Sequence, residues 1–240
     1  MQKQTVWNWW LLLLVLVCAK SLQAKDWGRQ PLPKSLKADF VYRLSSEKTV
    51  AFEWQQQKYE WQVLSYSKND DSHGASGALH VVLNKIDGEQ KVEVAATQNA
   101  ILCGSYGKCD VNQMALIEGD GQMSLLQIEA GVYSGQGHVF STAFLVQQQG
   151  QEVLPMLCWF AEREGFCGDK EYKFNTTSKL ILSGDTIQSL QLNTIGTCCS
   201  NDEAVEVQKR DVQIPYVKTK FKPDAEWIGN TICYLTAQDQ

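Results

Sequence analysis

Hydrophobic and polar residues alternate along much of the chain in short runs. A period of two is the pattern of a β-strand with one buried face, and helical periodicity does not exceed it over a comparable length. The clearest runs are 49–55, 59–65, 77–84, 91–97, 113–118, 123–129, 139–147, 179–182, 187–192 and 205–214. The pattern predicts an all-β protein.

Turn-forming residues separate these runs. They are Asp87-Gly88, Gly119-Asp120-Gly121, the segment 134–137, Gly150 and Ser183-Gly184-Asp185. Glycine and aspartate tolerate the positive φ that tight hairpins require. We therefore expect roughly ten or more short antiparallel strands, arranged as a disulfide-braced β-sandwich or a barrel-like meander.

The aromatic residues concentrate in one predicted hairpin, which would fold about Gln56-Gln57. That turn pairs Val50 with Val63, Phe52 with Trp61, and Trp54 with Tyr59. Gln-Gln is a poor two-residue turn, and a slip of one residue would move the rings to the other face. Trp54, Tyr59 and Trp61 are candidates for binding a glycan or a protein if their rings are exposed; the alternative is that they fill the core.

The N-terminus has the layout of a secretory signal peptide. One early charge, Lys3, precedes an apolar run built on residues 11–17, and a polar step ends at Ala24. The run is about half the 20 residues that a membrane-spanning helix needs. We expect cleavage after Ala24, and one exported domain over 25–240 that is periplasmic or secreted and has no membrane span. Lipid anchoring through Cys18 is the disfavoured alternative, because the large Val17 precedes it.

The charge balance argues against nucleic acid as a partner. The whole chain has a net charge of −5, and loss of residues 1–24 removes two lysines and no acids, which leaves −7. Phosphate binding needs clustered Lys and Arg. The expected partner is an envelope or extracellular protein or a glycan.

Seven of the eight cysteines follow the predicted cleavage point. In an exported chain they are expected to form disulfides. Proximity in sequence pairs Cys103 with Cys109, Cys158 with Cys167, and Cys233 with Cys199 or its neighbour Cys198. The odd count leaves one thiol over. No closely spaced pair of the C-x-x-C kind is present, so we expect no metal site and no cofactor.

Candidate catalytic residues are few. Glu162, Glu164 and Asp169 cluster around Cys167, and a Cys158–Cys167 bridge would hold them in one surface loop. Paired carboxylates are the chemistry of glycoside hydrolysis. His138 follows a glycine-rich turn and is a candidate base, as is His73 amid acids, although both are more easily explained as loop residues. No G-x-S-x-G nucleophile elbow occurs.

Two functions from different classes follow. The absence of a catalytic motif favours a binding or envelope-associated β module without enzymatic activity. The alternative is a secreted hydrolase that acts on a polysaccharide or another extracellular polymer through the acids near Cys167. A cleft in which these acids converge would favour the hydrolase, and an exposed aromatic face would favour binding.

Overall fold

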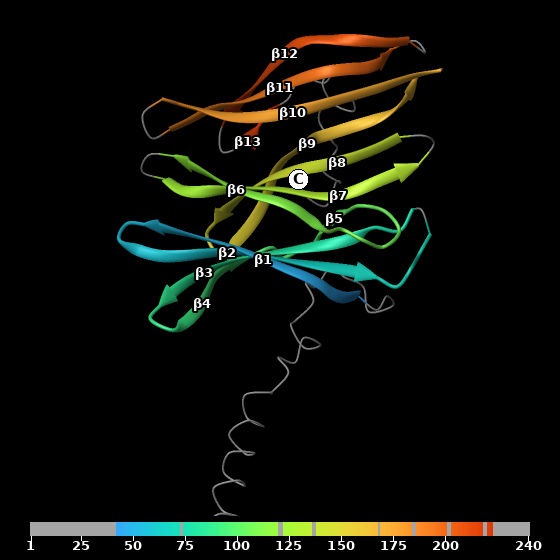
Figure 1. The fold of residues 1–240 in the computed structure, drawn as a ribbon. Helices are drawn as coiled ribbons and strands as arrows, with labels where there is room; N and C mark the ends of the chain where they lie inside the picture. Colours follow the sequence, from blue (N-terminus) through green and yellow to red (C-terminus); the bar gives the residue numbers. More distant parts are fainter. Residues whose placement is uncertain are drawn as a thin grey trace, which may run out of the picture. The chain divides into compact units, whose positions relative to one another are not determined.

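The computed structural model describes residues 42–222, except 73, 120–121, 136–137, 168, 184–185, 201–202 and 218–219. Every regular element in these residues is a β-strand (Figure 1). The strands are β1 (Tyr42–Trp54), β2 (Gln57–Lys68), β3 (Gly77–Asp87), β4 (Gln90–Ala96), β5 (Ile101–Cys103), β6 (Val111–Gly119), β7 (Gln122–Gly135), β8 (His138–Gln149), β9 (Glu152–Cys167), β10 (Lys170–Ser183), β11 (Thr186–Ser200), β12 (Glu203–Val217) and β13 (Lys220–Phe221). The all-β prediction is confirmed, but most strands are long where short ones were expected.

The strands follow one another as antiparallel hairpins in two series. The first series is β1 to β4, with β5 paired to the first residues of β3 on the same edge as β4. The second series runs from β6 to β12, with a two-residue ladder from β12 to β13. A single parallel bridge, Ala96 to Glu152, joins β4 to β9. This bridge makes the sheet of β1 to β12 mixed, which corrects the expectation of a purely antiparallel arrangement.

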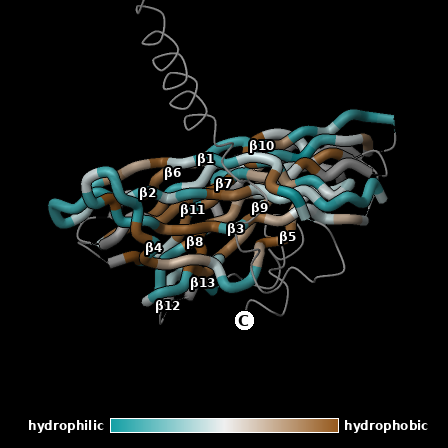
Figure 2. Tube along the Cα trace, turned by 90° about the horizontal axis from the view of Figure 1, so that it is seen from below, coloured by the Kyte–Doolittle hydropathy of each residue, from teal (hydrophilic) through white to brown (hydrophobic). Residues whose placement is uncertain are grey.

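Two apolar clusters lie on opposite faces of β7, β8 and β9. We call them the first core and the second core. On β8, Phe144 and Val146 belong to the first core, whereas Ala143 and Leu145 belong to the second. Successive residues of a strand point to opposite faces, so these strands are buried on both sides. Figure 1 accordingly shows them between the group of β1 to β4 and the group of β10 to β12, and Figure 2 shows hydrophobic stretches along them.

The hairpin of β1 and β2 has a different register from the predicted one. The turn residues are Gln55 and Gln56, with φ of 50° and 61°, so Trp54 pairs with Gln57 and Phe52 with Tyr59. Two consecutive positive φ values define the tight turn that matches the twist of paired strands. Every predicted pair is therefore shifted by two residues. A shift of two keeps each ring on its predicted face.

Strand β9 was not predicted, and it changes the reading of the segment around Cys158. Cys158 and Cys167 both lie on this one strand. At about 3.3 Å per residue their Cα atoms are about 30 Å apart. A disulfide needs Cα atoms within about 7 Å, so the predicted Cys158–Cys167 pairing is wrong. Cys158 is instead buried in the first core.

The remaining cysteine predictions have different outcomes. Cys103 and Cys109 form a disulfide, as their spacing predicts. Cys198 and Cys199 lie on β11, where only their backbone is described. Cys233, Cys18 and the predicted signal peptide lie outside the described residues, so the pairing of Cys233 with Cys199 or Cys198 stays a prediction.

Candidate functional site

The acidic candidates Glu162 and Glu164 lie on strand β9, not in a loop. They are two residues apart and therefore share one face of the sheet. Lys173 of β10 lies directly opposite Glu164, and its Nζ is 2.5 Å from Glu162 Oε1 and 3.0 Å from Glu164 Oε2. The hydrogen bonds that Lys173 donates to Glu162 and then to Glu164 raise the pKa of Lys173. The two carboxylates are thus the acceptors of one ammonium group.

The residue between these acids faces the other way. Arg163 places its guanidinium 5.7 Å from the ring centroid of Phe160 and 6.0 Å from that of Tyr172. Tyr172 and Phe174 are buried and form a small apolar cluster with Phe160. Alternation along β9 therefore separates a charged, half-exposed face from a face that packs against aromatic rings.

The other catalytic candidates do not join the two glutamates in a described cleft. Asp169 is exposed in the turn between β9 and β10. The backbone of His138 begins β8 opposite Gly165, but its side chain is not described. His73 lies outside the described residues. Among the catalytic candidates whose side chains are described, the structure brings together Glu162 and Glu164, with Lys173 between them.

The aromatic candidates on the first hairpin are part of the first core. Trp61 is fully buried and Tyr59 is 9% exposed. Phe52 stacks on Tyr59 at 5.6 Å between ring centroids, and Trp54 meets the same ring edge-on at 6.1 Å. Trp54 is partly buried against the first core. These rings fill the protein interior. Tyr59 and Trp61 therefore lack the exposure that a binding role would require.

Another surface feature is the loop closed by the Cys103–Cys109 disulfide. Both cysteines are fully buried, with Cα atoms 5.3 Å apart. The loop residues 104–108 connect β5 to the segment before β6. Lys108 N donates a hydrogen bond to Ser105 O across the loop at 3.0 Å. The disulfide and this hydrogen bond both restrict the backbone of residues 104–108.

Gly107 links the disulfide loop to the end of β2 through backbone hydrogen bonds. Gly107 O accepts from Lys68 N at 2.7 Å, and Gly107 N donates to Ala75 O at 2.9 Å. Gly107 has φ of 70°, and a Cβ there would lie 2.3 Å from Lys68 O. Glycine is therefore required at this contact, because any side chain would push the loop off β2.

A charged pair stabilises the same end of β2. Lys68 Nζ lies 2.9 Å from Asp70 Oδ2, and Asp70 Oδ1 accepts from Ser72 N at 3.0 Å. Hydrogen bonds from Ser72 and Lys68 lower the pKa of Asp70 to about 2. The carboxylate therefore keeps its partners through mildly acidic pH.

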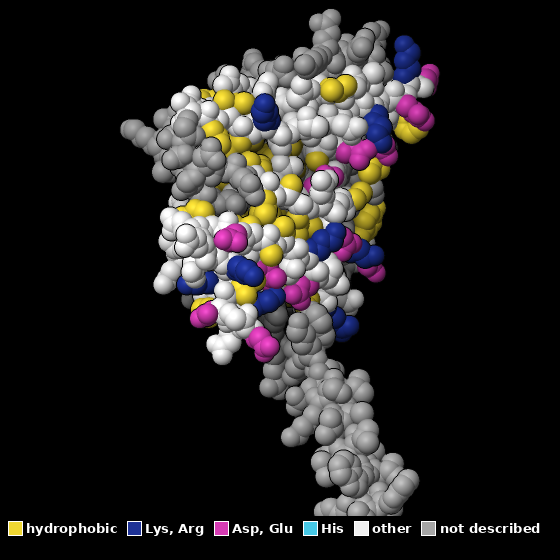
Figure 3. Space-filling view, turned by 60° about the vertical axis from the view of Figure 1, so that its left-hand side comes forward, with side chains coloured by type: hydrophobic (Ala, Val, Ile, Leu, Met, Phe, Trp, Pro, Cys, Tyr) yellow, Lys and Arg dark blue, Asp and Glu magenta, His cyan; other side chains and the backbone are white. Residues whose placement is uncertain are grey.

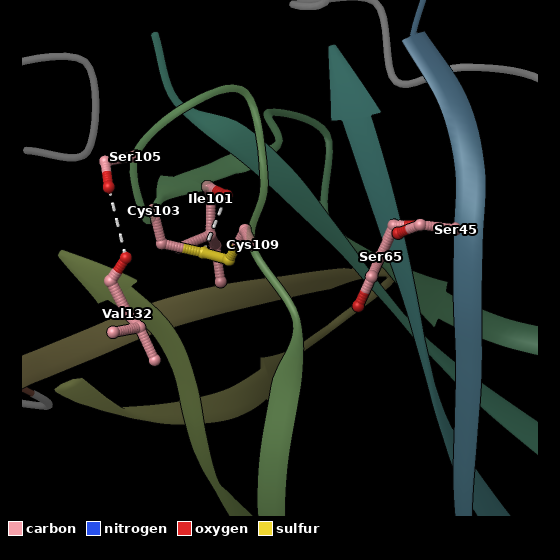
Figure 4. The surroundings of a disulfide bond; sticks show 7 residues. All are labelled: Ser45, Ser65, Ile101, Cys103, Ser105, Cys109 and Val132. Carbon is pink, nitrogen blue, oxygen red and sulfur yellow. Dashed lines mark hydrogen bonds between the residues drawn. A yellow bond between two sulfur atoms is a disulfide. The ribbon is translucent and has the colours of Figure 1, made fainter. Parts of the chain in front are cut away.

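Three large apolar side chains are exposed around this loop. Leu102 on β5 is 53% exposed, Tyr106 in the loop 40%, and Val132 on β7 52%. Figure 4 shows Ser105 directed at Val132, whose carbonyl accepts from Ser105 Oγ at 3.2 Å. Tyr106 has φ of 54°, a conformation that non-glycine residues seldom adopt. We call Leu102, Tyr106 and Val132 the loop patch.

From the sequence, Cys103 and Cys109 are predicted to form a disulfide, but no role is predicted for the residues between them. The available signal was a tyrosine flanked by serine and glycine inside a five-residue disulfide loop. Such a loop has too few side chains to bury an aromatic ring within itself. On the face drawn in Figure 3, hydrophobic side chains show between interspersed acidic and basic ones.

The described part of the chain contains no group of three or more histidine, cysteine or acidic residues arranged to hold a metal ion. It also contains no helix long and apolar enough to cross a membrane. Comparison with protein-family models finds no matching family, and comparison with curated proteins and with solved structures finds no significant match.

Proposed function

We propose that this chain is an exported binding module that docks on a partner protein through the loop patch. The observation that carries the proposal is Tyr106, held at φ of 54° in a disulfide-closed loop and 40% exposed, with Leu102 and Val132 also exposed on β5 and β7, the strands that adjoin this loop. Strained backbone that the surrounding structure maintains is concentrated at functional sites. Rigid exposed aromatic side chains are the commonest energetic centres of protein interfaces.

The architecture supports this role. We propose that the sheet stacks on itself as a sandwich, with β7, β8 and β9 shared by its two cores. A scaffold buried on both faces of its central strands holds its edge loops rigidly, and a rigid loop loses little entropy when it binds. The predicted signal peptide and the disulfide agree with a protein that folds in an oxidising compartment.

The hydrolase alternative is less well supported. A glycosidase needs one carboxyl group that donates a proton and a second that acts as nucleophile or base. Here Lys173 binds both Glu162 and Glu164, and all three side chains are about half exposed, at 55%, 42% and 47%. Replacement of both glutamates by glutamine leaves any measured activity unchanged if the group is a surface ion pair. A large loss of turnover in a polysaccharide hydrolysis screen would restore the hydrolase.

The test of the proposed function compares matched exposed residues. The purified chain from residue 25 onward is used to isolate partners from the envelope and medium of its source, and the affinity of each is measured for three variants. Tyr106→Ala and Leu102→Ser should weaken binding by about 10-fold or more, as hot-spot residues do. The control, Ile195→Ser, changes a residue that is 60% exposed on β11 and should bind as the parent does. Equal affinity of all three variants would refute docking through the loop patch.

A further inference from the structure

Three exposed apolar side chains lie on one face of the sheet where β7 and β9 end and β8 begins. Val132 is 52% exposed, Val139 37% and Phe166 56%. Val132 lies opposite Ser141, which is two residues from Val139 on β8. Val139 lies opposite Glu164, which is two residues from Phe166 on β9. Residues in these relations share a face. We call Val132, Val139 and Phe166 the diagonal row.

The diagonal row begins at the loop patch. Val132 belongs to both, and its carbonyl oxygen accepts from Ser105 Oγ in the disulfide loop at 3.2 Å (Figure 4). Seven large hydrophobic side chains of the described residues are exposed, and five of them belong to the loop patch or the diagonal row. The other two are Val92 on β4 and Ile195 on β11. Single exposed apolar residues are ordinary, whereas a group of them on one face marks an interaction site.

The far end of the diagonal row is acidic. Glu171 of β10 is exposed and lies directly opposite Phe166, and Glu164 precedes Phe166 by two residues on β9. Lys173 binds both Glu164 and Glu162. This face therefore carries three carboxylates and one ammonium group, a net charge of −2. A positive group beside Phe166 is attracted both by Glu171 and by the face of the ring.

The spacing along the diagonal row matches an extended polypeptide. Diagonal neighbours on adjacent strands are about 7–8 Å apart. Every second side chain of an extended segment points the same way, at a repeat of about 6.6–6.8 Å. An α-helix presents the same face every turn, at a repeat of about 5.4 Å, which is a poorer match. An extended segment that crosses β7, β8 and β9 therefore places one side chain against each member of the row.

We infer that the diagonal row is the second half of the partner-binding surface and takes an extended segment of the partner protein. That segment has apolar residues at every second position and Lys or Arg at one end. Its apolar side chains contact Val132 and Val139, and its basic side chain lies beside Phe166 and Glu171. The inference rests on the proposed function, because the loop patch supplies the other half of the surface.

The probe is a displayed library of random short peptides. The library is selected on the purified chain from residue 25 onward and depleted on the same chain with Tyr106→Ala and Phe166→Ser. The selected peptides should alternate apolar and polar residues and carry Lys or Arg at one end. No enrichment over the double variant, or enrichment of peptides with acidic ends, would overturn the inference.

Synthetic copies of the selected peptides then measure each contact. Phe166→Ser should weaken their binding by about 10-fold or more, as loss of a hot-spot ring does. Glu171→Lys should weaken it by about 5-fold at low salt, since an exposed ion pair is worth no more than that. The loss should shrink as ionic strength rises. Glu89→Lys, in the exposed turn between β3 and β4, makes the same change of charge and should bind as the parent does.

The variants separate the two halves of the surface. Loss of binding in Tyr106→Ala but not in Phe166→Ser or Glu171→Lys would refute the diagonal row and leave the loop patch. The reverse pattern would refute docking through the loop patch while the diagonal row stands. Equal weakening by Glu171→Lys and Glu89→Lys would overturn the recognition of a basic residue. A concentration-dependent dimer that Phe166→Ser abolishes would assign the row to a second copy of the chain and overturn the partner segment.

Discussion

The two cores share three strands but are stabilised differently. The first core lies under the hairpins of β1 to β5 and contains the buried Cys103–Cys109 disulfide. The second core lies between β7–β9 and β11–β13, and its described residues include no cysteine. The first is therefore braced covalently next to an exposed loop, whereas the described residues of the second are held by packing and strand hydrogen bonds. The disulfide therefore fixes the surface loop of residues 104–108 at the first core.

Each core nevertheless has a fully buried tryptophan. Trp61 of β2 lies in the first and Trp159 of β9 in the second. The indole Nε1 of each is buried with no hydrogen-bond partner among the described residues. An unsatisfied buried donor costs about 1–3 kcal/mol. In each core, burial of the large apolar indole ring opposes the cost of its unpaired N–H group.

The largest expected effect comes from removing one tryptophan at a time. Trp159→Ala and Trp61→Ala should each lower the free energy of unfolding by about 3–5 kcal/mol, because each leaves a cavity in a packed core. Both variants should unfold in a single transition in urea, since β7–β9 belong to both cores. A two-step transition in Trp159→Ala would show that the cores are separate folding units. Ile195→Ala, on the surface, is the control.

A smaller effect should come from the disulfide. The Cys103→Ala, Cys109→Ala double variant should lower the free energy of unfolding by about 2 kcal/mol, the amount that a short loop contributes in the chain-entropy model. Hydrogen exchange should show the loss around β5 and the loop, with the second core unchanged. Reduction of the parent chain should reproduce the result. Equal loss of protection in both cores would contradict the contrast drawn between them.

The smallest effect is a stabilisation. Gln55 and Gln56 both adopt positive φ in the β1–β2 turn. Replacing them by Asn and Gly, the preferred pair for such a turn, should raise the free energy of unfolding by about 0.5–1 kcal/mol. The same pair introduced at Gln56-Gln57 is the matched control, because Gln57 is already paired on β2. Greater stability of the control would favour the register predicted from sequence alone.

The central strands show why part of the fold was not predictable. Outer strands such as β10 alternate buried and exposed residues, and this period is visible in sequence. Strand β9 begins with a run, Val-Leu-Pro-Met-Leu-Cys-Trp-Phe, that is apolar on both faces and therefore lacks a period of two. A strand buried on both faces need not alternate: β7 and β8 still contain the alternating runs 123–129 and 139–147, whereas β9 does not alternate and was missed. Missing it placed Glu162 and Glu164 in a loop.

By itself, the sequence determined the strand class, the faces of the first hairpin and the Cys103–Cys109 bridge. Each follows from interactions between neighbours in the chain, where backbone geometry limits the choices. Only the tertiary structure decided that Trp61 is core, that Lys173 binds Glu162 and Glu164, and that Tyr106 is exposed. Those facts depend on which strands stack and in what register, and such contacts join residues far apart in sequence.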